Sequence, residues 1–376
     1  MHLYIHIPFC LSKCSYCDFN SYPISAFSHD IINNYISAIC NEIKKAKIKI
    51  NKNILLKTIY IGGGTPSILK NSQLKKITES INNNFKLSKN LEFTIECNPE
   101  TITKTKLNFY KKIGVNRISL GVQTFDDNIL KIINRIGNSK TTISAVDLIK
   151  KTGFSNISFD FIYALPNQTT DLFIQDLQKA VSLKPTHISI YCLTLNPYSE
   201  KYFNSIGAKI PNEDTQIQMY RKATNFLKKH KYYKYEISNF AIKGFESKHN
   251  LSYWQHRQYI GIGAGASSYI NGYRTKNISN VKTYIDSILN DKNYYEENYK
   301  LNEKEIKSEF VFLSLRLSGG LNLIKYKKRF KKSFFEDYKE FLKIWEGQKL
   351  FKIEKNSLTL TEKGILLSDE IFRELF

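Results

Sequence analysis

The sequence has no long apolar run. No stretch reaches the roughly 18 apolar residues that a helix needs to cross a bilayer, which excludes a transmembrane span. The N-terminal MHLYIHIPFC lacks the basic region and small-residue cleavage site of a signal peptide and is typical of a short strand instead. Low-complexity linkers are absent, as are repeats beyond an alternation of strand-like and helix-like segments. We therefore expect a cytoplasmic protein.

Cysteine is scarce, and its distribution is uneven. The chain has 376 residues and six cysteines, and three of these crowd together at Cys10, Cys14 and Cys17. In a reducing compartment, such crowding indicates metal ligation rather than disulfides. The other three stand in apolar contexts, and we expect them to be small buried side chains. They are Cys40, Cys97 and Cys192.

Acidic residues are few relative to basic ones. The 34 Asp and Glu residues face 56 Lys and Arg residues, which gives a formal charge of +22. Such a balance can indicate a nucleic acid or a membrane surface as partner. Here the excess is mostly lysine spread along the chain, and clusters such as residues 326–332 are short and expected to be solvated. We expect no nucleic-acid partner.

Strand-like runs alternate with segments of helical period such as residues 35–43 and 172–181. Six such repeats predict an α/β fold with a parallel sheet and right-handed crossovers. A closed eight-stranded barrel would need two more repeats, whereas a long helix near 214–229 and a strand-like 232–240 follow instead, so we predict an incomplete barrel. The expected strands are residues 3–7, 55–61, 91–97, 117–122, 157–163 and 187–193.

The pattern changes near residues 295–303. The tail is expected to hold helices at 303–317 and 334–348, a hairpin at 350–360 and a last helix capped by Thr361. This predicts a small C-terminal helical domain with a wing, similar to a winged helix. The predicted divisions are a core at 1–230, a connecting region at 231–300 and a C-terminal domain at 301–376.

The spacing Cys10-x3-Cys14-x2-Cys17 directly follows the first predicted strand. Three thiolates on one loop can hold three irons of a [4Fe-4S] cube and leave the fourth iron open to a ligand. Two alternatives remain at this point. One is a zinc site, for which His6 could be the fourth ligand; the other is a set of three packed thiols.

Further polar or glycine-rich positions fall at the ends of the next strands. Gly62-Gly-Gly-Thr-Pro-Ser67 follows the second strand, where glycines allow the backbone to approach a ligand closely. Glu96 lies at the end of the third strand, on the same rim. A tight turn, a strand-end cap or a surface salt bridge would explain each of these features singly, so the case for a site rests on their joint placement.

The cysteine triplet and Tyr4-Ile-His-Ile-Pro-Phe-Cys10 resemble the radical S-adenosylmethionine (SAM) proteins, in the branch that contains coproporphyrinogen dehydrogenase (HemN) and HemW. The resemblance implies a partial six-stranded barrel in which SAM chelates the open iron. It also implies that an electron from the reduced cluster cleaves SAM to methionine and a 5′-deoxyadenosyl radical. The SAM contacts it implies are Tyr4, Gly63, Gly64, Thr65, Glu96, Gln123, Arg135 and Asp160.

Several features favour HemW within this branch. In the dehydrogenase, a further cysteine follows the third cluster ligand by two residues, at the position that Phe19 occupies in this sequence. The dehydrogenase also has an extension before its first strand. The segment His249-Asn-Leu-Ser-Tyr-Trp254 matches the HNxxYW motif of HemW, and the similarity extends into the tail. The implied function is a haem chaperone that passes haem to an acceptor. The alternative is an oxygen-independent coproporphyrinogen III dehydrogenase, which is an oxidative decarboxylase. A third hypothesis, a radical enzyme acting on tRNA, is supported by the basic charge alone.

His249 is the residue we expect to ligate haem iron. A neutral imidazole is a good axial ligand, and Tyr253 and Trp254 could stack on a flat macrocycle. The alternative is a hydrogen-bonded turn that packs its aromatic neighbours. The resemblance further implies an electron donor and an unidentified acceptor, and it is consistent with a homodimer.

Three positions depart from the branch pattern. Gly137 and Ser267 stand where histidines are usual, and Asn167 stands where glycine is common. The first two put in doubt any haem or proton-transfer role taken from those positions, while the interpretation of the SAM site is unaffected.

Overall fold

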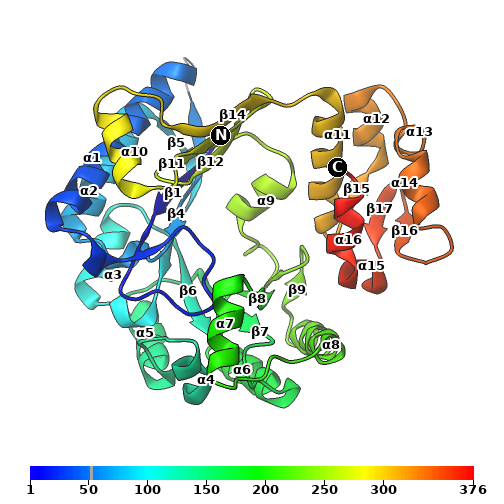
Figure 1. Cartoon of the computed structure of the whole chain (residues 1–376), viewed down its shortest axis with the longest axis horizontal. Helices are drawn as coiled ribbons and strands as arrows, with labels where there is room; N and C mark the ends of the chain where they lie inside the picture. The colour runs from blue at the N-terminus through cyan, green and yellow to red at the C-terminus, as the bar shows by residue number, and fades with distance from the viewer. Residues whose placement is uncertain (51–53) are drawn as a thin grey trace.

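The computed structural model describes residues 1–50 and 54–376, and its larger part is a partly closed barrel (Figure 1). Six strands pair in chain order, each parallel to the next. They match the six strands predicted from the sequence, so the partial barrel is confirmed. The strands are β1 (His2–Ile7), β4 (Leu55–Gly63), β5 (Lys86–Cys97), β6 (Arg117–Gln123), β7 (Ile157–Tyr163) and β8 (His187–Cys192).

Helices connect these strands, as the period of the sequence predicts. In the first of them Tyr35, Ile36, Ile39 and Ile43 form one buried stripe, the spacing that a helix needs to pack on a sheet. The connecting helices are α1 (His29–Ile50), α2 (Asn71–Asn84), α3 (Lys104–Lys112), α4 (Asp127–Ile132), α5 (Ser139–Lys151) and α6 (Thr170–Ser182). Short 3-10 turns lie at η1 (Ile24–Ala26), η2 (Pro66–Ile68) and η3 (Pro99–Thr101).

The sheet continues past the barrel on both sides. β11 pairs in parallel with β1 and carries an antiparallel meander, while β10 and β9 extend the opposite edge beyond β8. The elements after β8 are α7 (Pro197–Ser205), α8 (Glu213–Lys229), β9 (Tyr233–Lys234), β10 (Asn239–Ala241), α9 (Lys248–Trp254), β11 (Tyr259–Ile262), β12 (Ser267–Ile270), β13 (Tyr273–Asn277), α10 (Val281–Leu289) and β14 (Tyr295–Lys300).

The helix expected at 214–229 is confirmed as α8, but the strand expected at 232–240 is two strands. The chain turns between them because the buried Glu236 carboxylate accepts hydrogen bonds from the Ser238 N–H and the Asn239 amide. An acidic side chain that bonds its own backbone two residues on favours a turn over an extended strand.

The barrel strands have an apolar outer face and a polar inner face. In β6, Ile118, Leu120 and Val122 are buried in the main core, whereas the alternate residues from Arg117 to Gln123 line a cavity. Successive side chains of a strand point to opposite faces, so one strand serves both purposes. The interior of the barrel is therefore a polar site and not a second apolar core.

The C-terminal region forms its own apolar cluster, with Val311, Tyr326, Phe341 and Ile371 among its buried members. The expected hairpin is confirmed, and Thr361 caps the following helix by accepting from the Gly364 N–H. The elements are α11 (Glu303–Arg316), β15 (Leu321–Asn322), α12 (Leu323–Phe330), α13 (Phe334–Asp337), α14 (Lys339–Ile344), β16 (Phe351–Glu354), β17 (Ser357–Leu360), α15 (Glu362–Leu366) and α16 (Ser368–Arg373).

The basic side chains of residues 326–332 are exposed, as expected, and only Tyr326 among them is fully buried. One expectation for this region is corrected. The helix expected at 334–348 is divided at Tyr338 into α13 and α14. Tyr338 stacks on Phe334.

α1 is a surface helix of the sheet and carries several charged residues, among them Asp30 and Lys47. Within residues 1–50 and 54–376, no helix combines the length and the apolar character that a bilayer crossing requires.

Glu42 of α1 fastens the C-terminal strands of the sheet to the barrel. Its buried carboxylate accepts hydrogen bonds from the Gly263 N–H at 2.8 Å, the Asn277 amide at 2.7 Å and the Tyr284 hydroxyl at 2.5 Å. Burial raises the pKa of Glu42 to about 7. Three donors that all lie more than 200 residues from Glu42 in sequence thus share this one buried acceptor.

Glu42→Ala is expected to destabilise the protein by about 2–4 kcal/mol, because three buried donors lose their acceptor together. Urea unfolding at pH 7.5 measures the change in the free energy of unfolding. Glu79→Ala is the matched control, since its carboxylate is exposed and pairs only with Lys75 on the same helix. A Glu42→Ala effect as small as that of the control would contradict the fastening role.

Candidate functional site

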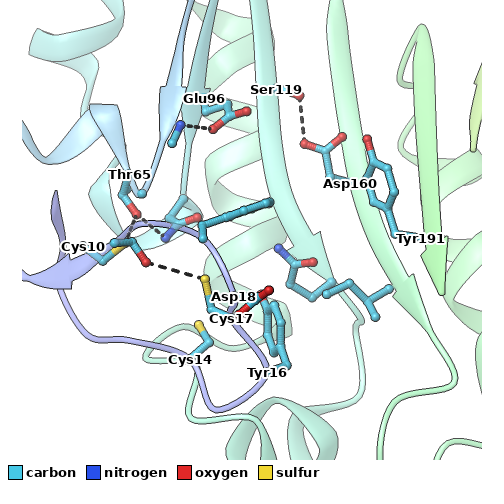
Figure 2. A pocket seen from close by; sticks show the side chains of 18 of the residues that line it. Cys10, Cys14, Tyr16, Cys17, Asp18, Thr65, Glu96, Ser119, Asp160 and Tyr191 are labelled. Carbon is cyan, nitrogen blue, oxygen red and sulfur yellow. Dashed lines mark hydrogen bonds between the residues drawn. The ribbon is translucent and has the colours of Figure 1, made fainter. Parts of the chain in front are cut away.

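The three clustered cysteines lie on one loop that follows β1. Cys10 is in β2 (Phe9–Cys10), which pairs with β3 (Tyr22–Pro23), and Cys14 and Cys17 occupy the loop between them. All three thiols are free and line one cavity of about 310 Å³ (Figure 2). Burial raises the pKa of the Cys10 thiol. Soft thiolate donors on one loop fit an iron–sulfur cluster.

A site for a single zinc ion is not built from these residues. Among residues 1–50 and 54–376, no three His, Cys, Asp or Glu side chains are grouped so as to hold one metal ion. His6, the fourth zinc ligand considered from the sequence, bonds the Tyr4 hydroxyl and the Asn20 carbonyl through its two ring nitrogens. A cube of four irons is larger than one ion, and its ligands stand farther apart.

The glycine loop after β4 lies directly against the cysteine loop. A Cβ on Gly64 would come within 2.9 Å of the Cys10 Sγ and 2.8 Å of the Phe9 carbonyl. Gly63 has a φ of +115°, a region that glycine alone adopts readily. The Thr65 hydroxyl donates to the Cys10 Sγ at 3.4 Å. Only glycine at both positions lets the backbone pass this close to the cysteine loop and the His6 ring.

Arg135 places a cation beside the cysteines. Its guanidinium donates to the Cys14 Sγ at 3.8 Å and to the Gly121 carbonyl at 2.8 Å. A positive charge beside a thiolate ligand offsets the negative charge that a bound cluster brings.

Glu96 and Asp160 face the cavity opposite the cysteines (Figure 2). Glu96 accepts hydrogen bonds from the Tyr60 hydroxyl at 2.6 Å and the Gly63 N–H at 3.0 Å. Asp160 accepts from three serine hydroxyls: Ser119 at 2.8 Å, Ser158 at 3.2 Å and Ser189 at 2.7 Å. Burial raises the pKa of Glu96 to about 7, and the charge of Asp160 acts in the same direction. The two carboxylates can accept further hydrogen bonds from hydroxyl groups of a ligand.

Gln123 also faces this space, at the end of β6. Its φ of +67° is unusual for a side chain of this kind, and the pairing of β6 with β7 is irregular between Gly121 and Gln123. Backbone conformations of this sort are common where a strand end aims a side chain at a ligand.

Ten of the twelve residues expected from the sequence to bind cofactors line this one cavity. They are Cys10, Cys14, Cys17, Gly63, Gly64, Thr65, Glu96, Gln123, Arg135 and Asp160. Tyr4 and His249 are not among the lining residues. Tyr4 is instead bonded to His6, beside the cavity wall formed by Tyr60.

His249 is buried on α9, and both of its ring nitrogens are engaged. Nδ1 bonds the Thr58 hydroxyl at 2.7 Å, and Nε2 bonds the Tyr253 hydroxyl at 2.9 Å. The first turn of α9 is held by Glu92, whose carboxylate accepts from the backbone N–H groups of Lys248 and His249. Iron ligation by His249 stays a prediction, and it requires one of these ring contacts to be exchanged.

Several cavity residues were missed by sequence reasoning. Asn98 stands two residues from Glu96 and could have been found by alternation along the strand, whereas the others become evident only from the sheet register. The missed residues are Tyr60, Asn98, Arg117, Ser119, Ser189 and Tyr191.

The expectation of three further buried cysteines holds in part. Cys97 is buried and Cys40 is partly buried, but Cys192 is exposed and lines the cavity. Cys192 is the last residue of β8, and its thiol donates to the Gln216 side chain of α8 at 3.4 Å.

Comparison with known families places these residues in context. The model of the Radical SAM superfamily matches residues 4–180, and that of the HemN C-terminal domain matches residues 301–367. The heme chaperone HemW of Bacillus subtilis is 37% identical over 372 residues, which cover 98% of this chain and 97% of that protein. The chain belongs to the HemW family of radical SAM proteins.

Other HemW proteins are similarly close. That of Lactococcus lactis is 38% identical and that of Haemophilus influenzae 32%, and in both cases at least 96% of each chain is covered. The solved structure of Escherichia coli coproporphyrinogen III oxidase (HemN) has a TM-score of 0.86, covering 100% of this chain and 89% of that one. At 22% identity it shows a shared fold. Membership of the radical SAM superfamily implies a [4Fe-4S] cluster and SAM as cofactors.

The three departures from the HemW pattern lie outside the cavity lining. A Cβ at Gly137 would face the Glu100 carboxylate, and Ser267 is exposed on β12. Asn167 has a φ of +60°, which asparagine tolerates better than most residues and which explains a glycine at this position in relatives.

Cys14→Ser is expected to abolish the cluster and leave the fold intact, because Cys14 lies on the cavity loop and not in the apolar core of the barrel. Iron and sulfide content after anaerobic reconstitution measures the loss, and circular dichroism with thermal unfolding checks the fold. Cys40→Ser is the matched control, since its thiol lies on α1 outside the cavity. A Cys14→Ser protein that retains a full cluster, or that fails to fold, would contradict the expectation.

Proposed function

We propose that the protein is a haem chaperone, which binds haem and transfers it to an acceptor protein, and which carries a [4Fe-4S] cluster and SAM. The observation that carries this proposal is the similarity to proteins named heme chaperone HemW, at 37% identity along nearly the whole of both chains. When bound, the cluster supplies single electrons and SAM is the group that receives them.

The residues of the cavity divide between the two cofactors. Cys10, Cys14 and Cys17 hold the cluster, and Arg135 offsets its charge. Gly63, Gly64 and Thr65 bring backbone close to the methionyl part of SAM. Glu96, Gln123 and Asp160 form hydrogen bonds with the polar groups of SAM. Tyr4 contacts Tyr60, which lines the cavity. The shared lining of these side chains supports the assignment.

The mouth of the cavity suits a flat apolar ligand. Phe19 is 67% exposed and Tyr191 42% exposed, although both line the cavity. Exposed aromatic rings at a cavity mouth can stack on a macrocycle. His249 lies deeper, with its ring 5.0 Å from that of Tyr60, and would ligate the iron after its Nε2 leaves the Tyr253 hydroxyl.

An oxygen-independent coproporphyrinogen III dehydrogenase is the alternative. The fold shared with HemN along the whole chain favours it. Phe19 stands against it, because the dehydrogenase pattern has a cysteine there and a phenyl ring offers no thiol.

We also infer the surroundings in which the protein acts. The six free thiols support a reducing compartment such as the cytoplasm. A protein electron donor and a haem-acceptor protein complete the proposal, with a homodimer as a further possibility to be tested by mass in solution.

The domain division at 1–230, 231–300 and 301–376 is also a proposal. A separate apolar cluster over residues 311–375 supports the boundary near 301. Residues 231–300 share the core of the barrel, with Tyr284 and Ile288 among its members, so the connecting region packs as part of the first unit.

Anaerobically reconstituted protein, given SAM and dithionite, is expected to take up one haem per chain and to leave coproporphyrinogen III unchanged. Haem absorbance and chromatography of the porphyrins measure the two results. Turnover to protoporphyrinogen would overturn the chaperone in favour of the dehydrogenase. Failure to bind haem at all would overturn the proposal without supporting the alternative.

His249→Ala is expected to weaken haem binding at least tenfold, with loss of the spectrum of a histidine-ligated haem, while SAM binding persists. Tyr253→Phe is a second variant to compare, because it removes the hydroxyl that bonds Nε2 of His249. It should keep the spectrum of a histidine-ligated haem. His230→Ala, at an exposed helix end, is the control. An unchanged haem spectrum in His249→Ala would overturn the ligand assignment.

A further inference from the structure

One row of residues across three barrel strands meets helix α9. His2 of β1 pairs with Thr58 of β4, and Thr58 pairs with Glu92 of β5. Glu92 accepts hydrogen bonds from the backbone N–H groups of Lys248 and His249, and the Thr58 hydroxyl bonds the His249 ring. The row therefore fixes both the first turn of the helix and the orientation of the imidazole that the helix carries.

A chain of hydrogen bonds runs from this row into α9. The His2 Nδ1 lies 2.9 Å from the Thr58 hydroxyl, and the same hydroxyl lies 2.7 Å from the His249 Nδ1. The His249 Nε2 lies 2.9 Å from the Tyr253 hydroxyl. Thr58 is 1% exposed, and its hydroxyl has one hydrogen between two imidazoles. It can donate to only one histidine and must accept from the other.

Each of the two histidines has one ring hydrogen. Both rings are buried, and no carboxylate among residues 1–50 and 54–376 bonds either of them. Burial lowers the pKa of His2 to about 4 and that of His249 to about 3. A neutral imidazole has one nitrogen that donates and one that accepts. The tautomers of His2 and His249 are therefore linked through the Thr58 hydroxyl.

The chain can run in two directions, and the first leaves a hydrogen unplaced. If Thr58 donates to the His249 Nδ1, the His249 Nε2 carries the ring hydrogen and donates to Tyr253. The Tyr253 hydroxyl hydrogen then has no acceptor in the described part of the chain. Burial raises the pKa of this hydroxyl well above its usual value, which indicates that water reaches it poorly. An unpaired donor in such a place is costly.

The second direction places every hydrogen. Tyr253 donates to the His249 Nε2, the His249 Nδ1–H donates to Thr58, and Thr58 donates to the His2 Nδ1. The last hydrogen is then on the His2 Nε2. This nitrogen bonds no protein group that the structure describes, but it is not fully buried, so water can accept from it. The hydrogen bonds of the protein therefore favour this direction.

We propose that His2 is a positioning residue for the haem ligand: by accepting from Thr58, it holds His249 in the tautomer with hydrogen on Nδ1, whose Nε2 can bind iron. This inference rests on the proposed ligation of haem by His249. A histidine that ligates a metal typically donates its other ring N–H to a fixed acceptor, which sets the tautomer and the ring orientation. In the opposite tautomer, the Nε2–H would face the iron.

Nitrogen-15 NMR reads the two tautomers directly, without haem. The sample is the full-length protein with labelled histidine and an oxidised cluster, and the His2→Leu and His249→Ala spectra assign the signals. The wild type should show His249 with hydrogen on Nδ1 and His2 with hydrogen on Nε2. A wild-type His249 with hydrogen on Nε2 would overturn the proposal.

His2→Leu removes the acceptor at the start of the chain. Thr58 should then donate to His249, whose hydrogen should move to Nε2. Haem affinity should fall about two- to tenfold, the net worth of one hydrogen bond. His2→Asn is the matched variant, because its amide oxygen can still accept from Thr58, and it should keep the wild-type tautomer and affinity. An unchanged His249 tautomer in His2→Leu would overturn the proposal.

Variants of Thr58 test the connecting hydroxyl. Thr58→Val should leave His249 as a mixture of tautomers and weaken haem binding about as much as His2→Leu, whereas Thr58→Ser should restore both properties. Thr94→Val is the control, since Thr94 is buried on β5 and its hydroxyl has no hydrogen-bond partner. A single Nδ1–H tautomer in Thr58→Val would contradict the linkage. If Thr58→Val fails to fold, the His2→Leu spectrum decides.

Failure of this inference is distinguishable from failure of the proposed function. A histidine-ligated haem in the wild type, together with an unchanged tautomer in His2→Leu, would overturn the inference alone. Absence of haem uptake would overturn the chaperone. A haem spectrum that His249→Ala does not alter would overturn the ligand assignment on which the role of His2 rests.

Discussion

The alternation of side chains along parallel strands is the constraint on which this structure depends. Each barrel strand must bury an apolar row under the outer helices and at the same time present its other row to the interior. In a sheet buried on both faces the interior row would normally be apolar as well. Here it is Glu, Arg, Asp and Ser, and hydrogen bonds among these groups offset the cost of burying them, as at Asp160 with three serine hydroxyls. The polar site is therefore part of the architecture and not an addition to it.

The loop that carries the cysteines is ordered by contacts far from it in sequence. Asn20 donates to the carbonyls of Ala264 and Ser279, and the Ser15 N–H donates to the carbonyl of Ile133. The strands that follow the six barrel repeats thus have a direct part in the site, because β11 and its neighbours form the wall against which the loop rests. Glu42, which fastens the same segment to α1, stabilises the loop indirectly.

The parts of the fold that repeat locally could be predicted from the sequence. Six apolar runs followed by helical period identified β1 and β4 to β8, and the spacing of the cysteines identified the loop after β1. The extension of the sheet by β11 to β14 could not be predicted, since its strands are short and join the barrel only through the long-range pairing of β11 with β1. The split of residues 232–240 followed from one buried glutamate, Glu236, whose burial depends on tertiary structure.

The candidate site shows the same division between local and tertiary information. Residues carried by motifs, such as Gly63, Thr65 and Arg135, could be placed at the rim of the barrel from the sequence. Arg117 and Ser119 lie deeper on the same strand, and without the sheet register nothing indicates which strand face looks inward. Cys192 was misjudged for a related reason: its apolar context predicted burial, but the strand ends there and leaves it exposed.

The contacts of α9 have an energetic consequence for haem ligation by His249. If His249 ligates the iron, its ring leaves one buried hydrogen bond, and each such bond is worth about 0.5–1.5 kcal/mol net. Shifting α9 further would also disturb the stacking of Arg316 of α11 on Trp254, at 4.4 Å. Both free-energy costs are small compared with the free energy gained by burying a macrocycle, which is roughly 25 cal/mol per Å² of apolar surface. If haem binds through His249, its burial would therefore outweigh the loss of the hydrogen bond to the Tyr253 hydroxyl.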